Sequence, residues 1–180
     1  MSLKHTLLTL LNTEPGSGYD LQQRFKNRLG YFWNASHQQI YQQLKKMLEQ
    51  GLIEFTLEPQ AGKPDRKVYQ LRPAGEQELL QWLQQPAKPN KINDALLVKL
   101  YGGDLLQPQE LMAEIEEHQQ LHRKMLDTFL ALEAEYLALP ASKQTPLKLP
   151  YLTLRRGIIG EEAWLRWAEE AKVTINELTE

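Results

Sequence analysis

The sequence predicts a mostly α-helical protein in two parts: a small helical head that ends in a β-hairpin, and a tail of long helices that form an antiparallel coiled coil. Apolar residues recur at helical spacing through most of the chain. The polar stretch from Gln84 to Asn90 holds two prolines, and helices tend to end before proline. We therefore place the head at residues 1–85 and the tail at residues 86–180.

Composition excludes several classes of protein. No apolar run is long enough to cross a bilayer, and the start of the chain, Met1 to His5, lacks the features of a signal peptide. The chain has no cysteine, which excludes disulfides and thiolate metal sites. We expect a cytoplasmic protein.

Charge is distributed unevenly over the two parts. The net charge is −2, but residues 1–85 hold ten Lys and Arg against eight Asp and Glu, and residues 86–180 hold eleven against fifteen. A slightly basic head on an acidic tail is the direction expected of a nucleic-acid-binding head on a scaffold.

Three helices are expected in the head. Leucines from Leu3 to Leu11 recur on one face of the first helix, which Pro15–Gly18 ends, and Tyr19–Arg28 continues as the second. Ser36 and Gln39 form an S-x-x-Q capping box at the start of the third. The apolar face of this third helix holds Ile40, Leu44, Met47 and Leu48, and Gly51 ends it.

Two short β-branched and aromatic runs follow, Leu52–Leu57 and Lys67–Leu71, around the polar residues 59–66. They predict a two-stranded hairpin with a long loop, and Pro73 then begins another amphipathic helix.

Three helices and a hairpin in this order are typical of a winged helix-turn-helix, whose third helix fits the major groove of DNA. The alternative without DNA is that the third helix has an ordinary solvated face, and that the cations of the hairpin prevent its edge strand from pairing with other chains. Candidate DNA contacts on the third helix, about residues 36–50, are Ser36, His37, Gln38, Gln39, Tyr41, Gln42, Lys45 and Lys46. Candidates on the wing, about residues 58–68, are Lys63, Arg66 and Lys67.

The tail begins with a short helix over Asn93–Tyr101, and a long helix then runs from Pro108 to about Leu139. Its apolar seam alternates by four and three, which is typical of coiled coils. The seam holds Leu111, Ile115, His118, His122, Met125, Phe129, Leu132, Tyr136 and Leu139.

The final helix, Tyr151–Leu178, should pack antiparallel to the long one. Together the two faces hold more apolar surface than a short pair can hide, so we expect them to join two subunits. The expected dimerisation residues are Leu111, Ile115, Met125, Phe129, Leu132, Tyr136, Trp164 and Leu165.

The sequence gives weaker signals for a metal site or an effector pocket. His118 and His122 have metal-ligand spacing, but two histidines leave a zinc site short of ligands, so we favour a structural role and expect no metal or cofactor. The close pair Gly157 and Gly160 indicates a tight helix crossing. The aromatics Trp82, Tyr101, Trp164 and Trp167 could line an effector pocket between head and tail, although such residues are more often core.

Several strings carry a family resemblance. They are Ser17–Leu21, Gly30–Gln39, Leu57–Lys67 and, more loosely, Leu152–Arg156. With these the chain resembles the PadR family of transcriptional regulators, in particular its AphA-like, virulence-activator branch. The resemblance implies a winged helix-turn-helix, a C-terminal coiled-coil dimerisation domain, and binding of a pseudo-palindromic promoter site as a homodimer, without catalysis. RNA polymerase or a second regulator is a further candidate partner.

Two alternatives stay open. One is a protein–protein adaptor that reuses the winged fold, and the other is an effector-responsive repressor with a ligand pocket between head and tail.

Overall fold

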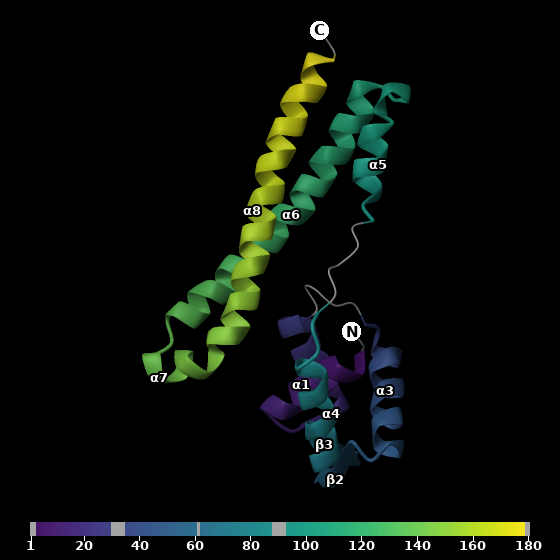
Figure 1. The fold of residues 1–180 in the computed structure, drawn as a ribbon, viewed down its shortest axis with the longest axis vertical. Helices are drawn as coiled ribbons and strands as arrows, with labels where there is room; N and C mark the ends of the chain where they lie inside the picture. Colours follow the sequence, from purple (N-terminus) through teal and green to yellow (C-terminus); the bar gives the residue numbers. More distant parts are fainter. Residues whose placement is uncertain (1–2, 30–34, 61, 88–92, 179–180) are drawn as a thin grey trace. The chain divides into compact units, whose positions relative to one another are not determined.

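The computed structural model describes residues 3–29, 35–60, 62–87 and 93–178. The chain divides into two compact units, residues 1–90 and residues 91–180 (Figure 1). No helix in the described part of the chain is both long and apolar enough to span a membrane.

The first unit is a winged helix. Its elements are α1 (Leu3–Thr13), β1 (Gly16–Ser17), α2 (Gly18–Arg24), a π-helical turn (Phe25–Leu29), α3 (His37–Glu49), β2 (Ile53–Gln60), β3 (Lys63–Leu71) and α4 (Pro73–Leu83). Leucines of α1 are buried against α2 and α3, and Leu79 of α4 completes the same core. The helical spacing in the sequence predicts this core correctly, because each helix has one apolar face to bury.

The hairpin differs from its prediction. The strands reach Gln60 and Lys63, so the expected long loop over residues 59–66 is wrong. Pairing continues past Pro59 because the register shifts between Glu58 and Gln60, and a bulge is where a strand tolerates a proline. Glycine at position 62 has a positive φ of 72° beside the turn.

The wing has a third strand that the sequence analysis missed. The two residues of β1 pair antiparallel with β3, Gly16 with Tyr69 and Ser17 with Val68, so the strand order is β1-β3-β2. A two-residue strand is too short to show alternation in a sequence. It joins the start of α2 to the wing.

The second unit is built on two long helices. Its elements are α5 (Ala95–Tyr101), a 3₁₀ turn (Gly103–Leu105), α6 (Pro108–Leu137), α7 (Ala141–Gln144), a second 3₁₀ turn (Thr145–Leu147) and α8 (Lys148–Glu177). Helices α6 and α8 lie side by side and run in opposite directions (Figure 1).

The heptad seam faces α8 of the same chain. Leu111, Ile115 and Phe129 are buried, and the other six seam positions are half-buried. On α8 the matching buried residues are Ile158, Leu165, Ala168 and Ile175. Of the eight predicted dimerisation residues, four are buried within one chain, namely Leu111, Ile115, Phe129 and Leu165, and the other four are half-buried. Their role in joining two chains stays a prediction.

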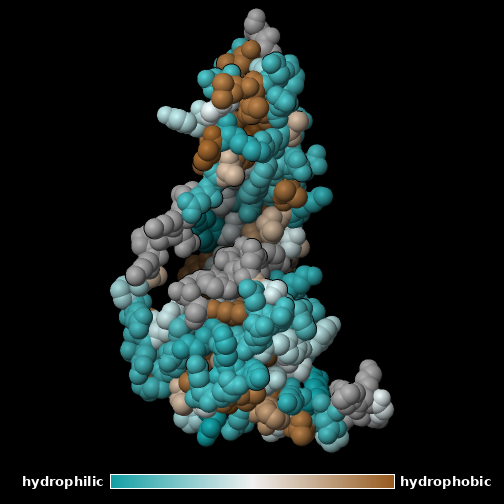
Figure 2. Space-filling view, turned by 90° about the vertical axis from the view of Figure 1, so that its right-hand side faces the viewer, coloured by the Kyte–Doolittle hydropathy of each residue, from teal (hydrophilic) through white to brown (hydrophobic). Residues whose placement is uncertain are grey.

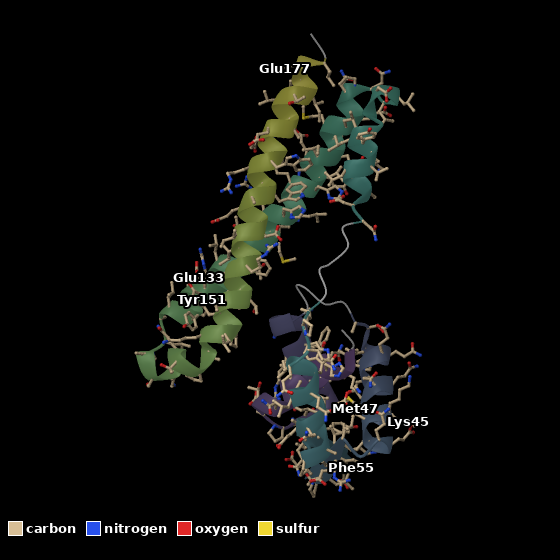
Figure 3. All side chains as sticks on the ribbon, in the orientation of Figure 1. Lys45, Met47, Phe55, Glu133, Tyr151 and Glu177 are labelled. Carbon is tan, nitrogen blue, oxygen red and sulfur yellow. The ribbon has the colours of Figure 1, made fainter. Side chains whose placement is uncertain are left out.

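Polar contacts join the C-terminal part of α6 to the N-terminal part of α8. The Tyr151 hydroxyl donates to Glu133 Oε1 at 2.7 Å, and Arg155 Nη1 donates to the same oxygen at 3.0 Å (Figure 3). The ring of Tyr136 stacks on that of Tyr151 with centroids 4.1 Å apart. The hydrogen bond from Tyr151, with the help of Arg155, holds the pKa of Glu133 below its ordinary value.

Gly157 lies where α6 and α8 pack tightly, as the glycine spacing suggested. A β-carbon at this position would lie 2.9 Å from the ring of Phe129. At Gly160, one turn on, a β-carbon would meet only the end of the flexible Arg156 side chain.

These two glycines provide a matched test of the crossing. Gly160→Ala should stabilise the protein, by up to about 1 kcal/mol, because alanine favours helix. Gly157→Ala gains the same propensity but overpacks against Phe129, so it should be less stable than Gly160→Ala by about 1–3 kcal/mol. Urea unfolding measures both, and equal stability of the two variants would contradict the close crossing.

Candidate nucleic-acid interface

One face of α3 is fixed by the core. Ile40, Leu44 and Met47 are fully buried, which turns the opposite face of the helix outward. Figure 3 shows Lys45 pointing away from the unit while Met47 lies on its inner side. A helix anchored along one face can present the other in a constant orientation.

The outward face carries the predicted candidates, and every one of them is exposed: Ser36, His37, Gln38, Gln39, Tyr41, Gln42, Lys45 and Lys46. Glu49, in the last turn, is the sole acid in α3. The face therefore offers carboxamides and cations with little negative charge to repel a phosphate backbone.

Ser36 and Gln39 hold the start of this helix. The Ser36 hydroxyl accepts from the Gln39 backbone N–H at 3.2 Å, and Gln39 Oε1 accepts from the Ser36 backbone N–H at 2.8 Å. The predicted capping box is therefore present. It occupies the carboxamide oxygen of Gln39, which a base contact would also need.

Tyr41 is held by two neighbours. Its ring lies over Gly18 so closely that a β-carbon at position 18 would be 2.7 Å from the ring. The centroid of the His37 ring is 4.4 Å from that of Tyr41. The tyrosine hydroxyl is thus presented from a fixed ring beside the start of α2.

The wing cations differ in their surroundings. Lys67 is exposed, and its ammonium lies 4.6 Å from the ring centroid of Phe55 on β2. Arg66 instead makes an ion pair with Asp20 of α2. The side chain of Lys63 lies outside the described residues, as do residues 30–34, which carry part of the family-like string.

Asp20 is a residue of the candidate site that the sequence analysis did not single out. Its Oδ2 accepts from the backbone N–H of Ser17 at 2.8 Å and from the Ser17 hydroxyl at 2.9 Å. Burial alone would raise the pKa of Asp20, but these hydrogen bonds and the Arg66 guanidinium outweigh it and lower the pKa. The signal was available, because Ser17 to Asp20 has the S-x-x-[DE] capping pattern already used for α3.

The two histidines with metal-ligand spacing, His118 and His122, lie in the second unit. His122 stacks on Trp164 with centroids 3.8 Å apart, and its Nδ1 pairs with Glu161. No group of three or more potential metal ligands occurs among the described residues. The structural role of the histidine pair stays a prediction, now with named partners.

The four predicted pocket aromatics do not share one environment. Trp82 stacks on His5 within the first unit, with centroids 4.7 Å apart, while Trp164 and Trp167 contact each other and the core of the second unit. Tyr101 is almost fully exposed.

A helix presented beside a β-hairpin wing, followed by a unit of two long helices, defines a winged helix-turn-helix regulator. The sequence profile of the transcriptional regulator PadR-like family matches residues 7–81, and that of the virulence activator alpha C-terminal domain matches residues 92–176. The chain belongs to the PadR family, whose members are transcriptional regulators rather than enzymes.

Relatives match along the whole chain. A probable transcriptional regulator of Mycobacterium tuberculosis is 33% identical, over 98% of this chain and 99% of the relative. The Vibrio cholerae virulence activator AphA is 35% identical with a TM-score of 0.82, over 98% of this chain and 99% of that one. Bacillus subtilis PadR in complex with operator DNA is 32% identical with a TM-score of 0.83, over 96% and 98%. The same Bacillus protein has also been solved with p-coumaric acid.

The cap of α3 gives a stability prediction. Ser36→Ala should lower the free energy of unfolding by about 0.5–2 kcal/mol, because the Gln39 backbone N–H loses its acceptor, the Ser36 hydroxyl. Gln38→Ala, two residues further on, is the control and should change stability by less than about 0.5 kcal/mol. Thermal or urea unfolding decides, and equal losses in the two variants would show that the cap contributes nothing.

Proposed function

We propose that this protein is a transcriptional regulator that binds a pseudo-palindromic promoter site as a homodimer in the bacterial cytoplasm, with no catalytic step. The observation that carries the proposal is the outward face of α3, polar and nearly free of acids, on a helix whose other face is locked in the core. The operator complex of a PadR relative supports it.

Within the major groove, α3 would divide its contacts between bases and backbone. Gln38 and Gln42 can offer a bidentate carboxamide to adenine. Tyr41, Lys45 and Lys46 reach outward from the same helix and suit phosphate oxygens, which position the protein without reading sequence. Because its oxygen is used by the cap, Gln39 would act chiefly by fixing the start of the helix.

Base readout and backbone contact can be separated experimentally. Selection of binding sites from random duplexes should return one preferred motif for the natural protein. Gln42→Ala should cost about 1–3 kcal/mol on that motif and relax the preference at one base. Lys45→Ala should weaken binding to all duplexes by a similar factor and lower the salt slope.

Matched behaviour of the two variants would contradict the assignment, and so would unchanged affinity in both. Failure of the natural protein to select any motif would overturn the proposed function itself.

The dimer surface would come from apolar residues that one chain leaves exposed. On α5 and the turn after it, Tyr101 is 96% exposed, Leu105 87% and Val98 72%. Figure 2 shows hydrophobic side chains gathered over this end of the helical unit. Large exposed apolar patches on soluble proteins mark interaction sites.

A second set of exposed apolar residues lies further along the two long helices, towards α7. Leu130 and Leu137 lie seven apart on α6, and Leu152 and Ile159 lie seven apart on α8; all four are exposed. A stable interface removes about 800 Å² per partner, which takes many residues on each side. We therefore propose that a second copy of this chain covers both sets.

Charge placed in this surface should separate the subunits. The double variant Tyr101→Glu and Leu105→Glu should sediment as a monomer where the natural protein is a dimer. Operator affinity should fall on the order of 10²- to 10⁴-fold, because the second head no longer binds at high effective concentration. Gln120→Glu adds charge on an exposed polar position of α6 and should leave both properties unchanged. A dimeric double variant would exclude the α5 patch from the interface.

A second candidate function has one observation in its favour. The Bacillus relative solved with p-coumaric acid shows that a protein of this family can hold a phenolic acid. An effector-responsive repressor would release its operator when such an acid is added, and titration of the selected motif with p-coumaric acid tests this directly.

A further inference from the structure

The ion pair between Asp20 and Arg66 joins two elements that are 46 residues apart in the chain. Asp20 is the third residue of α2, and Arg66 lies on β3, near the tip of the wing. The Nη2 group of Arg66 donates to Oδ2 of Asp20, and Nε of the same guanidinium is buried. The guanidinium is therefore turned toward α2.

Asp20 is itself rigidly held. Ser17, a buried residue, donates to its carboxylate from both the backbone N–H and the hydroxyl, and the Asp20 backbone N–H donates back to the Ser17 hydroxyl at 3.2 Å. Ser17 also pairs with Val68 in the ladder between β1 and β3. The carboxylate thus sits at the point where the start of α2 meets the sheet.

The wing changes character just beyond this point. At Val68 and Tyr69, strand β3 is paired on both sides, with β1 and β2. From Lys67 to the tip, its recorded pairing is with β2 alone. An isolated two-stranded ribbon is only marginally stable and can bend. Arg66 lies two residues into this outer part of the wing, where a contact with α2 limits the bending.

We propose that the Asp20–Arg66 pair is a strut that sets the angle of the outer wing against α2 and α3, and that both are positioning residues for DNA binding. Arg66 then does not serve as a phosphate contact, although the sequence suggests that role for it. This inference rests on the proposed function, because the angle of the wing matters only when α3 and the wing meet one duplex.

The exposed cation of the wing is the neighbouring Lys67. Successive residues of a strand point to opposite faces of the sheet, so Lys67 is directed away from the side on which Arg66 meets Asp20. Its ammonium is exposed over the Phe55 ring. Lys67 therefore keeps a free charge for a phosphate while Arg66 holds the wing in place.

The sign of one substitution separates the two roles of Arg66. If Arg66 contacts phosphate, Asp20 competes for it, and Asp20→Asn should tighten DNA binding. If the pair is a strut, Asp20→Asn should weaken binding of the selected motif, by at least about fivefold, the lower end of measured couplings between sites. The asparagine oxygen can still accept from the Ser17 backbone N–H, so the cap of α2 is largely kept.

Arg66→Gln tests the strut from the other side and leaves the cap of α2 untouched. It should weaken binding as much as Asp20→Asn, and the double variant should be no weaker than either single one, since both remove the same contact. The salt slope of log affinity should stay that of the natural protein in Arg66→Gln. It should fall by about 0.9 in Lys67→Ala, where one phosphate contact is lost.

Glu58→Gln is the matched control for removal of a carboxylate. Glu58 is exposed on β2 and is the register partner of Arg66 across the hairpin. Loss of its charge should leave DNA affinity unchanged or slightly tighter. Urea unfolding and sedimentation of every variant confirm that the fold and the subunit state are retained.

The same unfolding data keep the strut testable without DNA. In a cycle of natural protein, Asp20→Asn, Arg66→Gln and the double variant, the two substitutions should not be additive in the free energy of unfolding. Additivity there, or tighter DNA binding by Asp20→Asn, overturns the strut. If the natural protein selects no duplex, the proposed function fails, while the unfolding cycle still decides whether the pair is coupled.

Discussion

The burial of Ile40, Leu44 and Met47 is the constraint on which the rest of the candidate interface depends. These three residues fix the rotation of α3 about its axis. The polar residues on the opposite face of the helix therefore point outward. The helix contributes most of its apolar surface to the core of the first unit and its polar surface to a possible duplex. One packing interaction thus stabilises the fold and orients the groups that would read DNA.

The protein has two capping boxes, and only one of them also contacts a distant element. At Ser36 and Gln39 the box is local and fixes the first turn of α3. At Ser17 and Asp20 the same chemistry also receives Arg66 from β3, so a helix cap becomes a contact between α2 and the wing. A carboxylate can do this because it is charged and accepts several donors at once: Ser17 and Arg66 both donate to Oδ2 of Asp20.

Local patterns predicted most of the elements, and contacts distant in sequence account for what they missed. The periodicity of the leucines identified α1, and the capping residues and proline marked the starts of α3 and α4. The two-residue strand β1 exists only because β3 lies beside it, so no pattern announces it. The sequence analysis treated Arg66 as a free cation because its partner, Asp20, lies 46 residues away in the chain.

The heptad seam shows a similar limit. A seam from Leu111 to Leu139 indicates that the helix packs against an apolar partner, but it does not indicate which chain provides that partner. In the structure α8 of the same chain covers the seam, and Gly157 lets Phe129 approach closely. The exposed leucines outside the heptad are therefore further candidates for assembly, beside the half-buried positions of the heptad itself.

Activation and repression can both follow from this architecture. Among the relatives that share the fold along the whole chain, the Vibrio cholerae protein is a virulence activator and the Bacillus subtilis protein a negative regulator. A bound regulator has the opposite effect on transcription when its site overlaps the polymerase site than when it lies upstream. What the fold has to provide in both cases is the same: a recognition helix held at one angle and a scaffold that sets its spacing from a second copy. In the proposed dimer, the core under α3 would hold the recognition helix and the packed pair of α6 and α8 would set the spacing, so a separate unit would meet each requirement.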